Sequence, residues 1–181
     1  YNIKGITSIT IPTQLKSLGN QAFCECTNLD TLVWNAIRLT NESNLGYLNA
    51  GYILHVEFGS QVEKIPAALC QSNNNLTKVI IPENVKIIGA NAFRECNAMQ
   101  TIDIPSSVDS IDSGAFYGCQ GLIQLTLNEG LISIGADAFR GCQALVTVTL
   151  PNSLLNIGDR AFYECRSMTM AKFGTGLESL G

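Results

Sequence analysis

The chain has 181 residues, of which 46% are hydrophobic and only 14% are charged, and its net charge is −4 at pH 7. An acidic balance without any run of basic residues argues against a nucleic-acid partner, because binding to phosphates needs clustered Lys and Arg side chains. No stretch approaches the roughly 18 apolar residues of a membrane span, so we expect none.

A unit that recurs at a fixed interval organises the sequence. Its most constant feature is an Ile-Gly or Leu-Gly step, and from Pro66 onward every twenty-third residue holds the corresponding position. A fixed period in the twenties predicts a solenoid, in which each coil packs its apolar face against its neighbours. The low charged fraction agrees with such packing. The aligned positions are Gly19, Pro66, Gly89, Asp112, Gly135, Gly158 and Gly181.

The repeats follow one another along the whole chain. Residues 1–12 are the end of a repeat, and the first full copy follows them. Residues 35–54 break the pattern, and the step from Gly19 to Pro66 equals two periods plus one residue. We therefore expect a single solenoid over residues 1–181, with about eight coils, the first and last truncated, and an irregular coil at 35–54. Because the chain starts with Tyr1 and begins and ends within a repeat, we expect it to be part of a longer protein.

Each copy combines two periodicities. The segment Leu-x-x-Val-x-Leu-Pro alternates apolar and polar residues, which predicts a short strand that ends at the proline. The segment Ala-Phe-x-x-Cys-x-x-Leu has apolar residues three and four apart, which predicts a helical turn or short helix. The glycine before it is expected to need an unusual backbone angle, and Val-x-x-Ile-Gly is a candidate second strand. We therefore expect an α/β solenoid whose strands stack in register into one parallel sheet.

Seven cysteines are present, and five of them occupy one repeat position. An odd number excludes complete pairing within the chain. Stacked coils place such residues about 4.8 Å apart, which a disulfide tolerates, but parallel side chains suit disulfide geometry badly. We favour buried free thiols and keep bridges as the alternative; zinc is disfavoured because no Cys-x-x-Cys pair exists. The five are Cys26, Cys96, Cys119, Cys142 and Cys165, and we expect Phe93, Phe116, Phe139 and Phe162 to stack as a buried ladder.

The combination of Ile-Gly, Ala-Phe and Cys at fixed offsets resembles the leucine-rich repeat of the BspA-like family, which has the same period, over essentially the whole chain. The resemblance implies a right-handed coil, with a parallel sheet on the concave face and short helices or helical turns on the other. Proteins similar to this are typically cell-surface or secreted proteins of host-associated bacteria. Some act as adhesins for host matrix proteins or other cells. The resemblance implies no catalytic residue and no cofactor.

The residues themselves give no sign of an enzyme. The single histidine, His55, has no acid and nucleophile around it in a known catalytic pattern, and a solvated histidine on a sheet is the simpler interpretation. No glycine-rich phosphate loop or metal-ligand spacing appears. We therefore expect no catalytic site, no cofactor and no metal. Two sequons, at Asn41 and Asn75, are meaningful only in a secreted eukaryotic protein.

The outward positions of the predicted strands form the first candidate binding surface. In register, they give two rows of mixed polar, charged and apolar side chains. Solenoids offer extended faces of this kind to protein ligands, although threonine also simply suits an exposed strand. The candidate residues are Val33, His55, Glu57, Lys78, Ile80, Thr101, Asp103, Gln124 and Thr126.

The irregular coil is the second candidate, because insertions in repeat arrays often form binding loops. Tyr47 and Tyr52 are residue types favoured at interfaces, whereas Trp34 falls at a core position and is expected to pack inward. A merely degenerate coil is the simpler explanation of this stretch.

Three functional hypotheses remain open. The first is a non-enzymatic protein-binding module of a cell-surface or secreted protein, such as an adhesin for host matrix or cell-surface proteins. The second is a structural spacer that holds another domain away from the cell. The third is carbohydrate binding, which exposure of Tyr47 and Tyr52 side by side would favour. Uncapped coils also predict end-to-end self-association.

Overall fold

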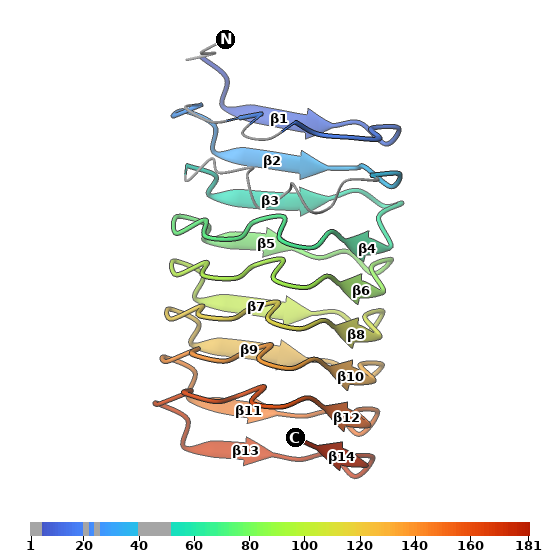
Figure 1. Cartoon of the computed structure of the whole chain (residues 1–181), viewed down its shortest axis with the longest axis vertical. Helices are drawn as coiled ribbons and strands as arrows, with labels where there is room; N and C mark the ends of the chain where they lie inside the picture. The colour runs from blue at the N-terminus through green and yellow to red at the C-terminus, as the bar shows by residue number, and fades with distance from the viewer. Residues whose placement is uncertain (1–4, 20–21, 24–25, 40–51) are drawn as a thin grey trace.

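The computed structural model describes residues 5–19, 22–23, 26–39 and 52–181. The described chain forms a stack of coils, with a column of long strands and, from β4 onward, a column of short strands beside it (Figure 1). The long strands are β1 (Ser8–Ile11), β2 (Thr31–Trp34), β3 (His55–Phe58), β5 (Lys78–Ile80), β7 (Thr101–Ile104), β9 (Gln124–Leu127), β11 (Thr147–Thr149) and β13 (Met170–Lys172). The short strands are β4 (Lys64–Ile65), β6 (Ile87–Ile88), β8 (Ser110–Ile111), β10 (Ser133–Ile134), β12 (Asn156–Ile157) and β14 (Ser179–Leu180).

The long strands pair in parallel with the register that the repeat predicts. Thr101 lies opposite Gln124, which is one full period later in the chain. Thr31 lies opposite His55, and this step is one residue longer than the period. The prediction that the irregular coil adds a single residue is therefore confirmed. Side chains alternate along each strand, so that one set points into the core and the other to solvent.

The column of long strands is divided between β5 and β7, so the expectation of one parallel sheet is wrong. β1, β2, β3 and β5 form one four-stranded sheet, and β7, β9, β11 and β13 form another. The short strands cross the same junction without a break, and the Cys70 N–H donates to the Ala92 carbonyl of the next coil at 2.7 Å. Strand pairing is therefore interrupted only on the long-strand side of this junction. Val79 of β5 is half-buried, whereas Val56 of β3 and Ile102 of β7 are buried.

The segments with helical periodicity form consecutive turns, and no helix occurs among the described residues. Successive N–H groups alternate between two acceptors. Ala92 donates to Gly89 of its own coil at 3.1 Å, and Phe93 donates to Ala115 of the next coil at 2.8 Å. The predicted helical face is therefore wrong. Each of the five turn segments from Ala68 onward has two residues with positive φ, which a right-handed helix does not accommodate; they are Ala68, Ser72, Asn91, Glu95, Gly114, Gly118, Asp137, Gly141, Arg160 and Glu164.

The repeated Ile-Gly glycine has a packing role, and the expected unusual backbone angle is wrong. Neither Gly89 nor Gly158 has a left-handed φ. A Cβ at Gly89 would lie 2.6 Å from the Ile65 carbonyl oxygen, and a Cβ at Gly158 would lie 2.5 Å from the Ala136 nitrogen. A side chain at either glycine would require the neighbouring coil to shift, whereas the coils that carry Pro66 and Asp112 at this position accommodate one.

Two ladders of side chains fill the interior. The four phenylalanines stack with ring centroids 5.2–5.3 Å apart. The thiol of Cys119 donates to the Phe93 carbonyl of the preceding coil at 3.0 Å, and Cys142 donates to Phe116 in the same way at 3.3 Å. Burial of the thiols is confirmed, except that Cys165 is only half-buried; the free cysteines in the described residues are Cys26, Cys70, Cys96, Cys119, Cys142 and Cys165.

Candidate functional site

The predicted binding residues lie together on the solvent side of the long strands. We call this side of β1–β3, β5, β7, β9, β11 and β13 the long-strand face. Strand pairing places Glu57 beside Ile80 and, farther along the stack, Asp103 beside Thr126. Glu57, Lys78, Ile80, Thr101, Asp103 and Gln124 are exposed, and Val33, His55 and Thr126 are half-buried.

The charges at the centre of this face have no charged partner. Glu57, Lys78 and Asp103 form no ion pair with any described residue. Ile80 follows Glu57 in the same row and is 45% exposed. An apolar side chain among unpaired charges of both signs is a surface that a partner with complementary charges would recognise. We call Glu57, Lys78, Ile80 and Asp103 the mixed patch.

Asn128 orients one of these charges, and sequence analysis missed it. Its side-chain amide donates to Oδ1 of Asp103 at 3.1 Å and to the Ile104 carbonyl at 2.9 Å. The available signal was the replacement of the strand-ending proline, which stands at the equivalent positions 82, 105 and 151. Proline has no side-chain donor, so the coils that carry proline at this position cannot make this contact.

His55 lies on the long-strand face between Thr31 and Lys78 of the adjacent strands. Its side chain is half-buried, and its Nδ1 atom is buried without a hydrogen-bond partner. No carboxylate holds the ring, so the orientation that a catalytic histidine requires is not provided by the described residues.

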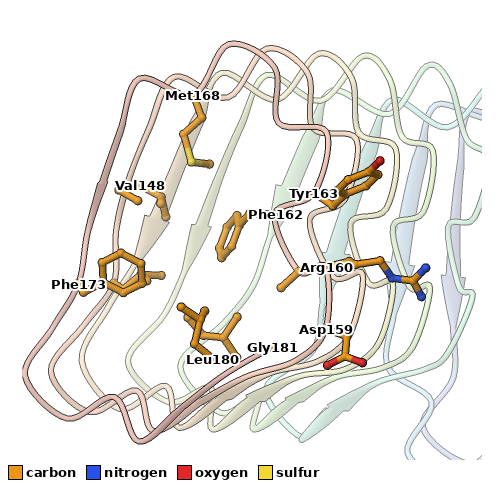
Figure 2. Close-up of a pocket in the computed structure, with 13 residues that line it drawn as sticks. Val148, Asp159, Arg160, Phe162, Tyr163, Met168, Phe173, Leu180 and Gly181 are labelled. Carbon is orange, nitrogen blue, oxygen red and sulfur yellow. The ribbon is translucent and has the colours of Figure 1, made fainter.

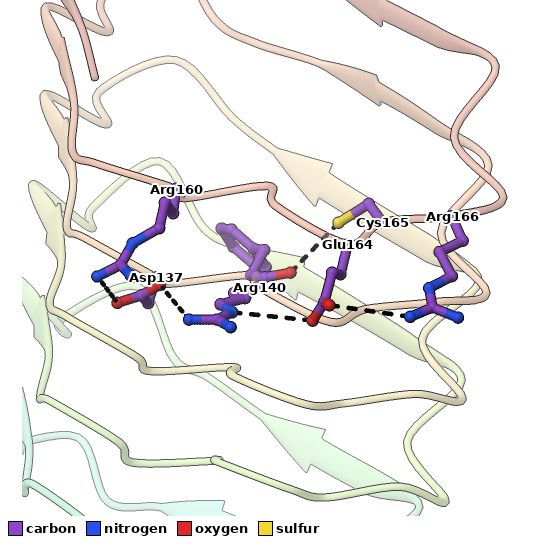
Figure 3. Close-up of polar contacts among 7 residues, drawn as sticks. Asp137, Arg140, Arg160, Glu164, Cys165 and Arg166 are labelled. Atoms are coloured by element: carbon purple, nitrogen blue, oxygen red, sulfur yellow. Dashed lines mark hydrogen bonds and ion pairs between the residues drawn. The ribbon is translucent and has the colours of Figure 1, made fainter.

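The turn segments carry charges that are paired with one another, in contrast to the mixed patch. Asp137 lies 3.4 Å from the guanidinium of Arg140 and 3.3 Å from that of Arg160 (Figure 3). Glu164 lies 3.9 Å from Arg140 and 3.8 Å from Arg166. Exposed pairs of this kind contribute about 0–1 kcal/mol each. Their charges satisfy one another between neighbouring coils.

One repeat position on the turn segments alternates arginine and tyrosine. Arg94, Tyr117, Arg140 and Tyr163 follow one another at the period of the repeat. The guanidinium carbon lies 4.3 Å from the ring centroid for Arg94 over Tyr117. For Arg140 the distances are 5.5 Å to Tyr117 and 5.0 Å to Tyr163. Cation–π contacts at such distances, within about 6 Å of the centroid, are attractive, so this ladder holds successive coils together.

The irregular coil is described only at its edges. Trp34 is fully buried, as predicted, and its indole N–H donates to the Ala36 carbonyl at 3.2 Å. Tyr52 is 45% exposed. Tyr47 lies outside the described residues, as does the sequon at Asn41, and the sequon at Asn75 lies at an exposed position.

A hollow of about 580 Å³ lies at the C-terminal end of the described stack (Figure 2). Its lining includes Phe162, Met168, Phe173 and Leu180. Phe162 occupies the repeat position of Phe116, which is fully buried in an interior coil. The hollow is therefore the exposed surface of the core at this end of the described stack. End-to-end association stays a prediction.

The described residues contain no group of three His, Cys, Asp or Glu side chains that could hold a metal ion. No helix in that part of the chain is long and apolar enough to cross a membrane.

A match between the repeats of this chain and a family model identifies the family. The model of the BspA type leucine rich repeat region matches residues 1–123 and 109–181, in six copies. The chain belongs to the BspA-type leucine-rich repeat family. No curated protein matches it.

Several solved structures are similar to this BspA-type chain. A leucine-rich repeat protein from Bacteroides ovatus shares 31% identity over 82% of the chain, with a TM-score of 0.69, and the match spans 38% of that protein. The T. pallidum leucine-rich repeat protein shares 20% identity over 93% of the chain and 73% of its own length, with a TM-score of 0.59. The pneumococcal vaccine antigen PcpA shares 17% identity over 98% of the chain and 41% of its own, with a TM-score of 0.51. The last two likenesses show the fold alone.

Proposed function

We propose that this chain is a non-enzymatic protein-binding module of a cell-surface or secreted protein, and that the long-strand face binds the ligand. The mixed patch carries the proposal. Ile80 is an exposed apolar side chain, and the charges of Glu57, Lys78 and Asp103 are unpaired among the described residues. In the turn segments, by contrast, Asp137 and Glu164 are paired with arginines.

The family supports the coarser part of this proposal. BspA-type repeats suggest an interaction or surface role. Adhesion to a host matrix or cell-surface protein is the specific form that we propose. A spacer role is the alternative, and carbohydrate binding near the exposed Tyr52 is a weaker one.

Surface plasmon resonance tests the proposal. The 181-residue chain is passed over fibronectin, fibrinogen and a glycan panel, beside a Lys78→Glu/Asp103→Lys double variant. We expect saturable binding to a protein surface that the variant loses, because reversed charges repel a complementary partner. A matched control is Lys86→Glu/Asp109→Lys, which makes the same charge changes at exposed positions away from the long-strand face.

Both variants keep the net charge of the chain, so equal loss of binding in the two would show that the loss is not specific to the long-strand face and would contradict the proposed face. Binding to no protein would favour the spacer. Binding only to glycans, with loss in Tyr52→Ala, would favour the carbohydrate hypothesis.

A further inference from the structure

A second feature of the long-strand face lies beyond the mixed patch, over β9 and β11. It is a shallow hollow of about 520 Å³, lined by the polar residues Gln124, Thr126, Thr147 and Thr149 and by aliphatic residues, of which Leu125 and Leu127 are buried and Ile123 and Val146 are exposed. The apolar pair precedes the two strands: Ile123 is 51% exposed and Val146 is 40% exposed. The lining is uncharged, so a neutral aliphatic side chain fits it without loss of charge hydration.

The hollow lies between two opposite charges in one row of the face. Asp103 lies opposite Thr126 on one side, and Lys172 lies opposite Thr149 on the other. Both charged side chains are exposed and form no ion pair among the described residues. Asn128 holds the carboxylate of Asp103 at 3.1 Å. The row therefore consists of an acidic residue, two neutral residues and a basic residue, which are Asp103, Thr126, Thr149 and Lys172.

The spacing of this row matches an extended peptide. Three coil steps of about 4.8 Å place the two charges about 14 Å apart. An extended chain covers about 13 Å in four residues, and residues i, i+2 and i+4 lie on one side of it. A ligand strand can therefore present three side chains to the carboxylate, the hollow and the ammonium group together.

We propose that the hollow and its two flanking charges bind an extended protein segment with a basic residue at i, an aliphatic residue at i+2 and an acidic residue at i+4, in either chain direction. Asp103 receives the basic residue, the hollow receives the aliphatic one, and Lys172 receives the acidic one. The inference rests on the proposed protein-binding function, because it specifies the chemistry of the ligand on the same face.

The probe is the peptide acetyl-Gly-Arg-Ser-Leu-Ser-Glu-Gly-amide, titrated into the isotopically labelled chain and followed by NMR. We expect shifts at Ile123, Val146 and Thr149 that saturate at millimolar peptide. Asp103→Asn and Lys172→Gln are each expected to weaken binding about twofold to fivefold, the scale of an exposed ion pair. The matched controls are Asp109→Asn and Lys86→Gln, which make the same charge changes at exposed positions off this face.

A double-mutant cycle assigns the contacts. The effect of Asp103→Asn is expected to vanish with a peptide in which alanine replaces arginine, and to persist when alanine replaces glutamate. Lys172→Gln is expected to show the reverse. For the hollow, Ile123→Ser/Val146→Ser is expected to weaken binding, whereas Ile132→Ser, which changes another exposed side chain at 43% exposure, is not.

Several results would overturn the inference: no saturable shift up to about 10 mM peptide, additive effects throughout the cycle, or equal losses in the control variants. None of these results would contradict the proposed protein-binding function, which is tested separately with whole proteins and the mixed-patch variant. Conversely, a protein that binds the long-strand face without sensitivity to Ile123 or Lys172 would support the function and contradict this ligand.

Discussion

Single residues at fixed repeat positions determine how the coils of this protein stack. The phenylalanine position is the clearest example, because the rings of Phe116 and Phe139 lie 5.2 Å apart and 2° from parallel. Both side chains are fully buried. Each ring thus contacts the coil before it and the coil after it, and offset aromatic stacking adds to the burial of apolar area.

Replacement of Phe116 by alanine tests this ladder. We expect a loss of about 3–5 kcal/mol in the free energy of unfolding, because the ring is removed from a close-packed interior and leaves a cavity. Urea denaturation followed by circular dichroism measures the loss. Phe162→Ala is the internal comparison, and a smaller loss is expected because Phe162 is only partly buried. A loss below about 1 kcal/mol for Phe116→Ala, the scale of a surface change, would contradict the buried ladder.

The cysteine position makes stability depend on pH. Burial raises the pKa of Cys119 to about 12. Its unfolded value lies near 8.5–9, so between about pH 9 and 12 the unfolded state releases a proton that the folded state retains. The free energy of unfolding is therefore undiminished below pH 9. It decreases as the pH rises toward 12, by about 1.4 kcal/mol per pH unit for each such thiol.

We therefore expect the free energy of unfolding to fall steeply as the pH rises above 9. In the Cys119→Ala variant, the free energy of unfolding is expected to fall less steeply than in the unsubstituted protein. Urea unfolding at pH 7, 9.5 and 10.5 measures both slopes. Tyrosine and lysine titrate in the same range, but they contribute equally to the two proteins, so the difference in slope belongs to the thiol. Identical slopes would contradict the raised pKa.

At the scale of elements, strands could be predicted from the sequence and turns could not. The alternation in segments such as Thr101–Ile104 identifies strands, and the fixed period gives their register, including the extra residue before His55. Apolar spacing of three and four is shared by helices and by consecutive turns. The left-handed positions that decide between them hold residues as different as Ala68, Glu95 and Gly141, so residue type gives no signal.

The candidate face was predictable for the same reason as the strands, since outward positions follow from register. The division between β5 and β7 was not, because it arises in a coil whose interior residues differ. Leu69 and Cys70 replace the usual Ala-Phe pair, and Asn73 replaces the ladder cysteine. Asn73 instead donates to the Ile53 carbonyl at 3.0 Å. Such a change of packing depends on the neighbouring coil, which a local pattern does not contain.

At the scale of the whole molecule, the pairing of the long strands is interrupted at one junction of the stack. β5 and β7 belong to separate sheets, whereas the short strands and the turn segments continue across the junction. The mixed patch spans the junction, because Ile80 lies on β5 and Asp103 lies on β7. A ligand on this patch would contact both sheets and would restrain their separation at the position where strand pairing is interrupted.

Amide hydrogen exchange measures the difference. At the β9 junction, the N–H groups of Ile123 and Gln124 donate to the Gln100 carbonyl at 2.8 and 3.1 Å. The corresponding bonds from Val146 and Thr147 are absent among the described residues, although β11 pairs with β9. The N–H groups of Gln100 and Thr101 have no such bond to the described residues of the preceding coil. We expect these two amides to exchange at least about tenfold faster, since an amide without a native hydrogen bond exchanges without local unfolding. Equal protection would show that the sheet is continuous in solution, and protection of Gln100 and Thr101 that rises only with bound ligand would show that the ligand closes the junction.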